Sequence, residues 1–226
     1  KMMKERMEKY CSEWMSIIHN EEVVCLFNSV ENKREDFIRQ LYRLKVDISN
    51  IKALFPRYKV AIGVGRTVEG LEQYQESIST AMSAIRNRFG RKDESLLEEE
   101  GRAASESEVS SIVSAAVKRD LLKSIELVDT ESFLKSLRDL KRELSAHLQD
   151  GELLYGVYRE LVTIFIMGMN SWFDSEIKTT PWELMRGYQQ LYGFGEVFDW
   201  LIDHCLEIME RYEETQKNQE ARPIRL

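Results

Sequence analysis

Helix-breaking residues are scarce in this chain: 3 prolines and 11 glycines stand among 226 residues. That is about half of the share that these two residues usually have. Few breakers, together with many Leu, Glu, Lys, Met and Ala residues, favour long helices. An all-β sandwich or barrel, which needs frequent turns, is therefore disfavoured. Hydrophobic residues make up 43% of the chain, which excludes disorder as its dominant state.

The beginning of the chain predicts a helix followed by a β-hairpin. Apolar residues recur there at alternating intervals of four and three, which predicts a helix that ends near Trp14. These residues are Met3, Met7, Tyr10, Trp14 and Ile17. Two apolar runs then flank the polar tip 19–22, and the second run, 23–27, is β-branched and aromatic. Two such runs around a short polar tip are typical of a β-hairpin.

A helix, a strand and another helix are predicted next. The apolar face of the first helix spans residues 37–55 and is either core or a dimer contact, and Pro56 ends the helix. Residues 58–65 predict a buried strand, and residues 71–89 predict a helix. The order helix, hairpin, helix, strand, helix predicts an antiparallel sheet with helices on it, an α+β layer.

Every element predicted after this layer is a helix. A capping box of Ser105 and Glu108 opens the first one, which is expected to run to about residue 128. A second capping box, Thr180 with Glu183, is the clearest local signal in the chain. Further helices are predicted over 133–148, 155–172 and 197–212.

Charge is unevenly distributed along the chain. Residues 1–92 carry 17 basic and 12 acidic side chains, a net charge of +5, and residues 93–226 carry 15 and 27, a net charge of −12. The change falls in a polar, acidic run at 93–105, which predicts a linker. The acidic second part argues against direct binding of nucleic acid, which needs concentrated Lys and Arg.

The cysteines and histidines show no pairing or metal-binding pattern. They are Cys11, Cys25, Cys205, His19, His147 and His204. An odd number of cysteines far apart in sequence indicates a reduced, cytoplasmic protein. The histidines lack zinc-binding spacing, so we expect no metal and no cofactor. No apolar stretch approaches the roughly 20 residues of a membrane span, so we expect no membrane contact.

Two local features are weak candidates for chemistry. Gly63 and Gly65 follow the predicted strand, but a phosphate-binding loop needs more glycines and a helix that starts directly on them. Tight packing at a strand end is the favoured interpretation. The acidic run 98–100 could hold a cation, although a solvated surface is the favoured interpretation.

The helical part contains a His–Cys neighbour pair and many aromatic residues. His204 and Cys205 point about 100° apart on a helix, so a nucleophile–base pair is not indicated. The aromatic residues indicate either a ligand pocket between helices or an ordinary core. They are Trp172, Phe173, Trp182, Tyr188, Tyr192, Phe194, Phe198 and Trp200.

The predicted hairpin resembles the GGDEF hairpin of diguanylate cyclases. His19, Asn20, Glu21, Glu22 and Val23 stand where that family has Gly-Gly-Asp-Glu-Phe. Both glycines are replaced by residues with side chains, so the backbone cannot approach a nucleotide closely. The resemblance therefore implies a degenerate GGDEF-like domain that is not an enzyme, without catalytic, cofactor-binding or metal-binding residues. An active cyclase with Glu21 in its site is the disfavoured alternative.

A second resemblance extends further along the chain. Residues 62–66 and 77–85 are similar to the Ile-Gly-x-Gly-Arg and Ser-Tyr-x-Glu-Ala-x-x-Ala-Leu stretches of degenerate GGDEF-like domains in bacterial transcription regulators. Ser77, Ala81 and Ala84 match this pattern. The region 118–214 is similar to the central region of YesN-type regulators of the AraC family.

The resemblance implies a domain order and a role. We expect a degenerate GGDEF-like domain at 1–92, a linker at 93–105, a helical domain at 106–216, and a linker at 217–226 toward a missing C-terminal domain. The expected role is a non-enzymatic relay and dimerisation module of an AraC-family regulator. It would couple an N-terminal input, such as the receiver domain of a two-component response regulator, to C-terminal helix-turn-helix motifs. We expect a homodimer that contacts DNA through the missing domain. The alternative is a small-molecule or nucleotide-sensing module on the same scaffold.

Overall fold

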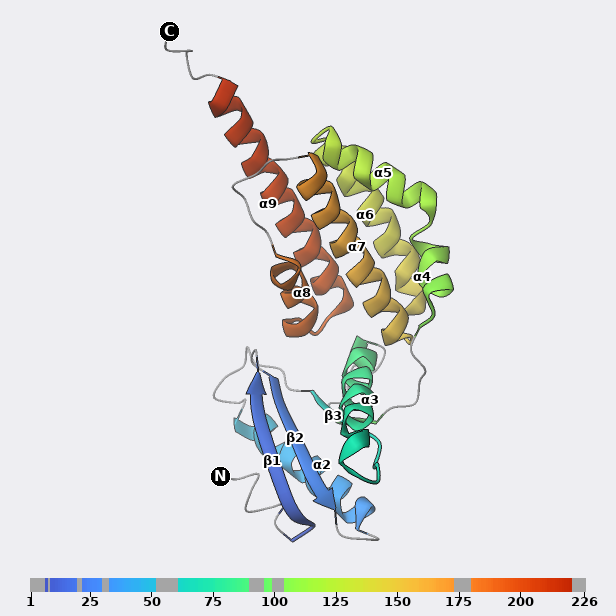
Figure 1. Cartoon of the computed structure of the whole chain (residues 1–226), viewed down its shortest axis with the longest axis vertical. Helices are drawn as coiled ribbons and strands as arrows, with labels where there is room; N and C mark the ends of the chain where they lie inside the picture. The colour runs from blue at the N-terminus through green and yellow to red at the C-terminus, as the bar shows by residue number, and fades with distance from the viewer. Residues whose placement is uncertain are drawn as a thin grey trace. The chain divides into compact units, whose positions relative to one another are not determined.

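The structure, a computed structural model, forms two compact units (Figure 1). It describes residue 7 and residues 9–19, 22–29, 33–51, 61–89, 96–98, 104–172 and 180–220. The N-terminal unit comprises residues 1–88 and 93–100, and the helical unit comprises residues 89–92 and 101–226. The chain is mostly helical and has small sheets in the N-terminal unit, which agrees with an α+β class.

The N-terminal unit starts with an antiparallel hairpin of β1 (Cys11–His19) and β2 (Glu22–Ser29). The predicted hairpin is therefore present, but the prediction that the first helix extends to Trp14 is wrong, because β1 begins at Cys11. Met7 is helical, and residues 1–6 lie outside the described residues. Met15 pairs with Leu26 and Ile17 pairs with Val24, so β1 gains cross-strand partners that a helix would not provide. The helical spacing of the apolar residues contains no information about these distant partners.

Helix α2 (Arg34–Ile51) packs against the hairpin, with the Phe37 ring 5.0 Å from the Phe27 ring. Leu41 and Leu44 are buried in a core that also contains Cys11 and, on its margin, Phe37. The helix face that was predicted as either core or dimer contact is thus core over its described part. Phe55 and Pro56 lie outside the described residues.

The second sheet differs from the prediction of one antiparallel sheet. Strand β3 (Ile62–Val64) pairs in parallel with β4 (Leu96–Glu98), and within the described residues neither strand pairs with the hairpin. Helix α3 (Tyr74–Arg86) connects the two strands, with the short 3₁₀ turns η2 (Leu71–Gln73) and η3 (Asn87–Phe89) at its ends. Parallel pairing follows from this crossover, because a strand that returns after a helix enters in the same direction.

Strand β4 also changes the interpretation of 93–105 as a linker. Its residues Leu96 and Leu97 pair with Ile62 and Gly63, so the acidic run contains a strand of the N-terminal unit. A three-residue strand is too short to stand out from its polar neighbours in the sequence. The chain consequently passes from the N-terminal unit to the helical unit at residue 89, returns at 93, and leaves again at 101.

The helical unit begins with two helices where one was predicted. The Ser105–Glu108 capping box is present, with the Ser105 amide donating to Glu108 Oε2 at 2.7 Å. The helix then stops, and the Ser114 side chain accepts a hydrogen bond from Val117 and starts the next helix. A serine that accepts this bond competes with helix continuation. The two helices are α4 (Glu106–Ile112) and α5 (Ala115–Glu126).

Four further helices complete the described part of the helical unit. The Thr180–Glu183 capping box is confirmed, with each residue's side chain bonded to the other's backbone. The last helix continues to Glu220, past the boundary at 217 where a linker was predicted, and 221–226 lie outside the described residues. The helices are α6 (Thr130–Leu144), which the turn η4 (Ser145–His147) follows, α7 (Gly151–Trp172), α8 (Pro181–Gln190) and α9 (Phe194–Glu220).

One continuous apolar core holds these helices together. Two ion pairs on its margin join helices that are distant in sequence. Lys118 Nζ lies 2.5 Å from Glu160 Oε1 and links α5 to α7, and Lys141 Nζ lies 2.6 Å from Asp199 Oδ1 and links α6 to α9. Within the described ranges, none of the helices combines the length and the apolar composition that crossing a bilayer requires.

Candidate functional site

The GGDEF-like positions lie at the end of the hairpin. The backbones of His19 and Glu22 pair with each other, and Val23 pairs with Ile18. Asn20 and Glu21 lie outside the described residues, and so do the side chains of His19 and Glu22. The described side chains next to the tip are aliphatic and exposed, at 79% for Ile18 and 60% for Val23. Aliphatic side chains neither donate nor accept hydrogen bonds, so this part of the tip has no groups for polar recognition.

Gly63 in β3 and Gly65 just after this strand pack directly against the backbone of α3. A Cβ atom on Gly63 would lie 2.1 Å from the carbonyl oxygen of Ala81, and a Cβ on Gly65 would lie 1.9 Å from that of Ser77. Two atoms that are not bonded to each other cannot come this close, so only glycine, which has no Cβ, allows the strand and the helix to approach in this way. The space beside the strand is filled by the helix, which leaves no cradle for a phosphate group. This geometry supports tight packing as the role of the glycine pair.

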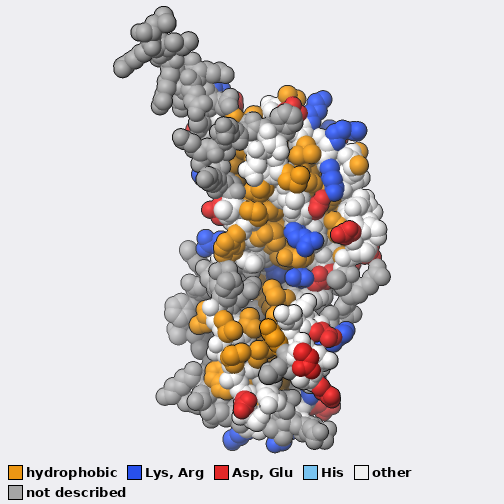
Figure 2. Space-filling model, in the orientation of Figure 1, with side chains coloured by type: hydrophobic (Ala, Val, Ile, Leu, Met, Phe, Trp, Pro, Cys, Tyr) orange, Lys and Arg blue, Asp and Glu red, His pale blue; other side chains and the backbone are white. Residues whose placement is uncertain are grey.

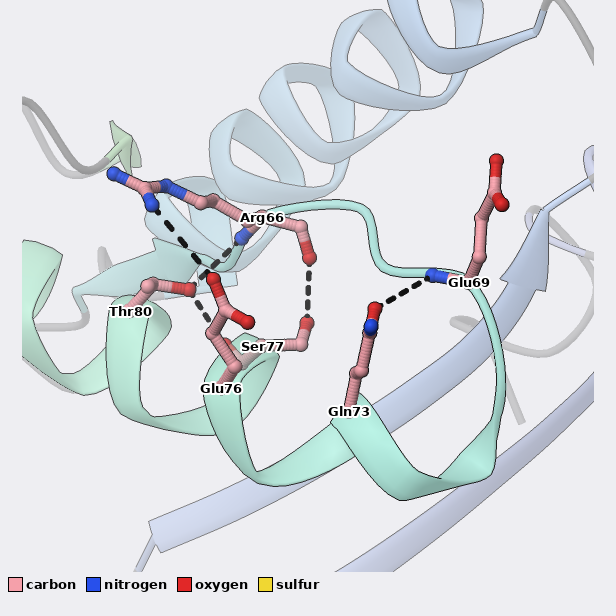
Figure 3. A network of polar contacts seen from close by, with 6 residues as sticks. All are labelled: Arg66, Glu69, Gln73, Glu76, Ser77 and Thr80. Atoms are coloured by element: carbon pink, nitrogen blue, oxygen red, sulfur yellow. Dashed lines mark hydrogen bonds and ion pairs between the residues drawn. The ribbon is translucent and has the colours of Figure 1, made fainter.

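Polar contacts fix the segment after β3 onto the same helix (Figure 3). The Arg66 amide donates to Thr80 Oγ1 at 2.9 Å, and Ser77 Oγ donates to the Arg66 carbonyl at 2.8 Å. The Arg66 guanidinium lies 3.7 Å from a Glu76 carboxylate oxygen. Farther along, the Glu69 amide donates to Gln73 Oε1 at 3.3 Å. The polar residues near the glycines thus join a strand end to a helix.

The residues that carry the regulator resemblance therefore lie together. Ser77 and Ala81 form the helix surface under the glycines, and Ala84 is fully buried in the next turn. Thr80, which departs from the pattern, is also buried and contacts Arg66. The motif describes how β3 packs on α3 in this chain.

The aromatic residues of the helical unit form core contacts. Tyr188 is at their centre, with its ring 5.2 Å from Tyr155, 5.2 Å from Tyr158 and 5.3 Å from Phe89. The Tyr188 hydroxyl donates to the Gly151 carbonyl at 3.2 Å. Edge-to-face rings at these distances are typical of a packed interior. Among the other predicted aromatics, Trp182 is exposed, and Trp172 (its side chain) and Phe173 are outside the described residues.

His204 and Cys205 do not form a catalytic pair. His204 Nδ1 lies 3.0 Å from the carbonyl oxygen of Trp200, to which it donates, and its ring stacks on Trp200 at 3.7 Å between centroids. Cys205 is buried in the core, and burial raises the pKa of its thiol far above the usual range. Neither side chain is placed to activate the other.

Thiol labelling tests this placement. Cys25 is half-buried and burial raises its pKa, whereas Cys205 is fully buried with a larger rise in pKa. Because only the thiolate attacks alkylating reagents, we expect iodoacetamide to modify Cys25 in the native protein and Cys205 only after unfolding. Raising the pH should accelerate the modification of Cys25 and leave Cys205 unmodified, as peptide mass spectrometry can measure. Equal rates at both cysteines in the native protein would contradict the buried position of Cys205.

Of the predicted acidic site at 98–100, the structure describes only the backbone of Glu98. Glu98 is the last residue of β4, and 99–100 lie outside the described residues. Within the described ranges, no three His, Cys, Asp or Glu side chains come close enough to hold a metal ion together.

Sequence analysis missed a shallow hollow on the outer face of α2. It has a volume of about 410 Å³ and is lined by Arg39, Tyr42, Arg43, Val46 and Asp47. These residues recur at intervals of three and four on the side of α2 opposite its core residues. The same spacing in the sequence would have indicated this second helix face.

Comparisons with known proteins assign no family. No family model matches the chain, and neither a curated protein nor a solved structure matches it. Any functional statement therefore depends on the residues and contacts described above.

Proposed function

We propose that this chain is a non-enzymatic regulatory module of an AraC-family bacterial transcription regulator. Its role would be to relay a signal from an N-terminal input to helix-turn-helix motifs that contact DNA. The supporting observation is the packing of Gly63 and Gly65 on Ser77 and Ala81. These are the residues on which the resemblance to such regulators rests, and they form one contact in a unit that also has the expected hairpin.

The side chains around the hairpin tip support a role without catalysis. A cyclase of the GGDEF type needs glycine at the first two positions so that the backbone can approach a nucleotide. His19 and Asn20 stand there instead. Ile18 and Val23 place exposed aliphatic groups beside the same tip, where a triphosphate would need charged or polar partners.

Two measurements test this proposal. The parent gene should encode two helix-turn-helix motifs after Leu226, and the purified chain incubated with GTP and Mg²⁺ or Mn²⁺ should form no cyclic dinucleotide by liquid chromatography. A stop codon or an unrelated domain after Leu226 would remove the AraC assignment. Product formation that is lost in Glu21→Ala would establish an active cyclase instead.

A sensing module is the second candidate, favoured by the hollow on α2. Arg39, Arg43 and Tyr42 are among the residues that line it, and two guanidinium groups with an aromatic ring suit an anionic ligand with a flat ring. A ligand at 100 times its Kd stabilises the folded state by about 2.7 kcal/mol. Thermal shift measurements with guanine nucleotides, cyclic dinucleotides and sugars should detect this effect, and Arg43→Ala should abolish it. The absence of any shift would reject this candidate.

A further inference from the structure

The chain passes between the two units inside a single turn. The 3₁₀ turn η3 directly follows α3, and the boundary between the units falls within this turn, between Arg88 and Phe89. The chain then returns to the N-terminal unit at residue 93, where β4 pairs with β3. Phe89 is therefore flanked along the chain by elements of the N-terminal unit on both sides, with α3 before it and β4 after it.

The Phe89 side chain belongs to the core of the helical unit. Charged side chains lie on the surface of that unit in the view of Figure 2, whereas Phe89 is only 5% exposed. Its ring lies 5.3 Å from the ring of Tyr188 and 6.4 Å from that of Phe194, with interplanar angles of 89° and 74°. Connecting segments usually run over the surface of a protein. A buried aromatic residue at a crossing between two units therefore does more than join them.

The two rings that contact Phe89 link three helices of the helical unit. Phe194 is the first residue of α9, and Tyr188 lies in α8. The Tyr188 hydroxyl donates to the carbonyl oxygen of Gly151, the first residue of α7, at 3.2 Å. A change in the position of Phe89 therefore reaches α7, α8 and α9 through at most one intervening side chain.

Within the N-terminal unit, α3 has no free space beside β3. A Cβ on Gly65 would lie 1.9 Å from the Ser77 carbonyl oxygen, and the Arg66 amide donates to Thr80 Oγ1 at 2.9 Å. Closely packed interiors transmit strain, because their atoms have no room in which to absorb it. A change that separates β3 from α3 therefore displaces the helix that η3 and Phe89 continue.

We propose that Phe89 couples the two units: a change in the packing of β3 on α3 displaces Phe89 and loosens the helices that its ring contacts. The inference rests on the proposed relay role and gives that role a physical route. The coupling requires only the continuous chain and the contacts within each unit. Withdrawal of the Phe89 ring leaves Tyr188 and Phe194 without a packing partner on one side, and the loss of such contacts destabilises a core.

Hydrogen exchange of the full chain, followed by mass spectrometry, tests this coupling, because amide exchange reports the local opening of each helix. Gly65→Ala separates β3 from α3. In the otherwise unchanged chain it should accelerate exchange in α8 and in the first turns of α9 by about tenfold, a usual size for coupling between two sites. In a Phe89→Ala background the same substitution should change this exchange by less than about twofold, as independent sites do.

The matched control is Phe133→Ala, which removes another buried aromatic residue from the same core. Phe133 is 1% exposed, and its ring lies 5.7 Å from that of Phe165. In this background Gly65→Ala should keep its effect on α8 and α9, because Phe89 is still in place. Phe89→Leu and Phe133→Leu, which leave smaller cavities, replace the alanine variants if the helical unit does not fold with them, and the same pattern is expected.

Unchanged exchange of α8 and α9 in Gly65→Ala would overturn the coupling, and so would an acceleration of equal size in the Phe89 background. Neither outcome depends on the gene sequence after Leu226, which tests the regulator assignment separately. An unrelated domain after Leu226 would remove that assignment and leave the coupling through Phe89 in place.

Discussion

Replacing Gly65 with alanine is expected to lower the free energy of unfolding of the N-terminal unit by about 3 kcal/mol, at the upper end of the usual cost of overpacking. The added Cβ would lie 1.9 Å from the Ser77 carbonyl oxygen. This oxygen is backbone and cannot rotate away, so β3 and α3 must separate. The separation would also lengthen the bonds from Thr80 and Ser77 to the Arg66 backbone.

Urea unfolding of this variant can be followed by the fluorescence of Trp14 in a variant without the other tryptophans. The matched control is Gly195→Ala, because outside its own helix the nearest atom to an added Cβ is Lys141 Nζ at 3.9 Å. That substitution lies in a helix, where alanine is favoured over glycine, so it should leave stability unchanged or slightly higher. A loss below about 0.5 kcal/mol in Gly65→Ala would contradict the close strand–helix contact, since surface substitutions have effects of that size.

Replacing Tyr158 with alanine is expected to destabilise the helical unit by about 3–5 kcal/mol. Tyr158 is fully buried, and its ring lies 5.2 Å from Tyr188 and 6.0 Å from Phe198. Its hydroxyl donates to the Leu184 carbonyl at 2.8 Å and joins α7 to α8. The variant would leave a cavity at the centre of the aromatic cluster and would remove the side-chain hydrogen bond between α7 and α8.

Tyr158→Phe separates these two contributions, because it keeps the ring and removes only the hydroxyl. Its expected cost is about 1 kcal/mol, the usual net contribution of one hydrogen bond. Thermal unfolding monitored by circular dichroism at helical wavelengths measures both variants. Met167→Ala, at an exposed residue of the same helix, serves as the control and should cost little. Similar small losses in all three variants would show that the aromatic cluster is not a packed core.

Local sequence signals predicted the helical unit well. The two capping boxes and the apolar repeats depend on residues three or four positions apart, and the structure places both boxes at helix starts. The break at Ser114 was missed because the apolar spacing continues across it. Only the hydrogen bond from Val117 to the Ser114 side chain, together with packing around Val113, distinguishes two helices from one.

Strands were predicted less completely because their partners are distant in the sequence. The start of β1 at Cys11 depends on pairing with Ser29, and the strand β4 depends on pairing with β3 across an entire helix. The glycine pair was recognised as a packing feature, but the atoms that it approaches became known only from the structure. The sequence shows the strands of the hairpin as two hydrophobic runs, but it does not show that Met15, Ile17 and Ile18 in these runs are exposed.

Helix α9 (Phe194–Glu220) is the last described element of the helical unit. It contains 27 residues, and a helix of that length extends about 40 Å. Tyr212 is buried, while the described side chains at Glu214 and Lys217 lie in solvent. A segment joined rigidly to this end takes its angular orientation from the helix, and each inserted residue rotates that segment by about 100°. The output of such a connection would depend periodically on the length of an insertion. One inserted residue would change the orientation of the segment far more than seven, because seven residues complete nearly two full turns.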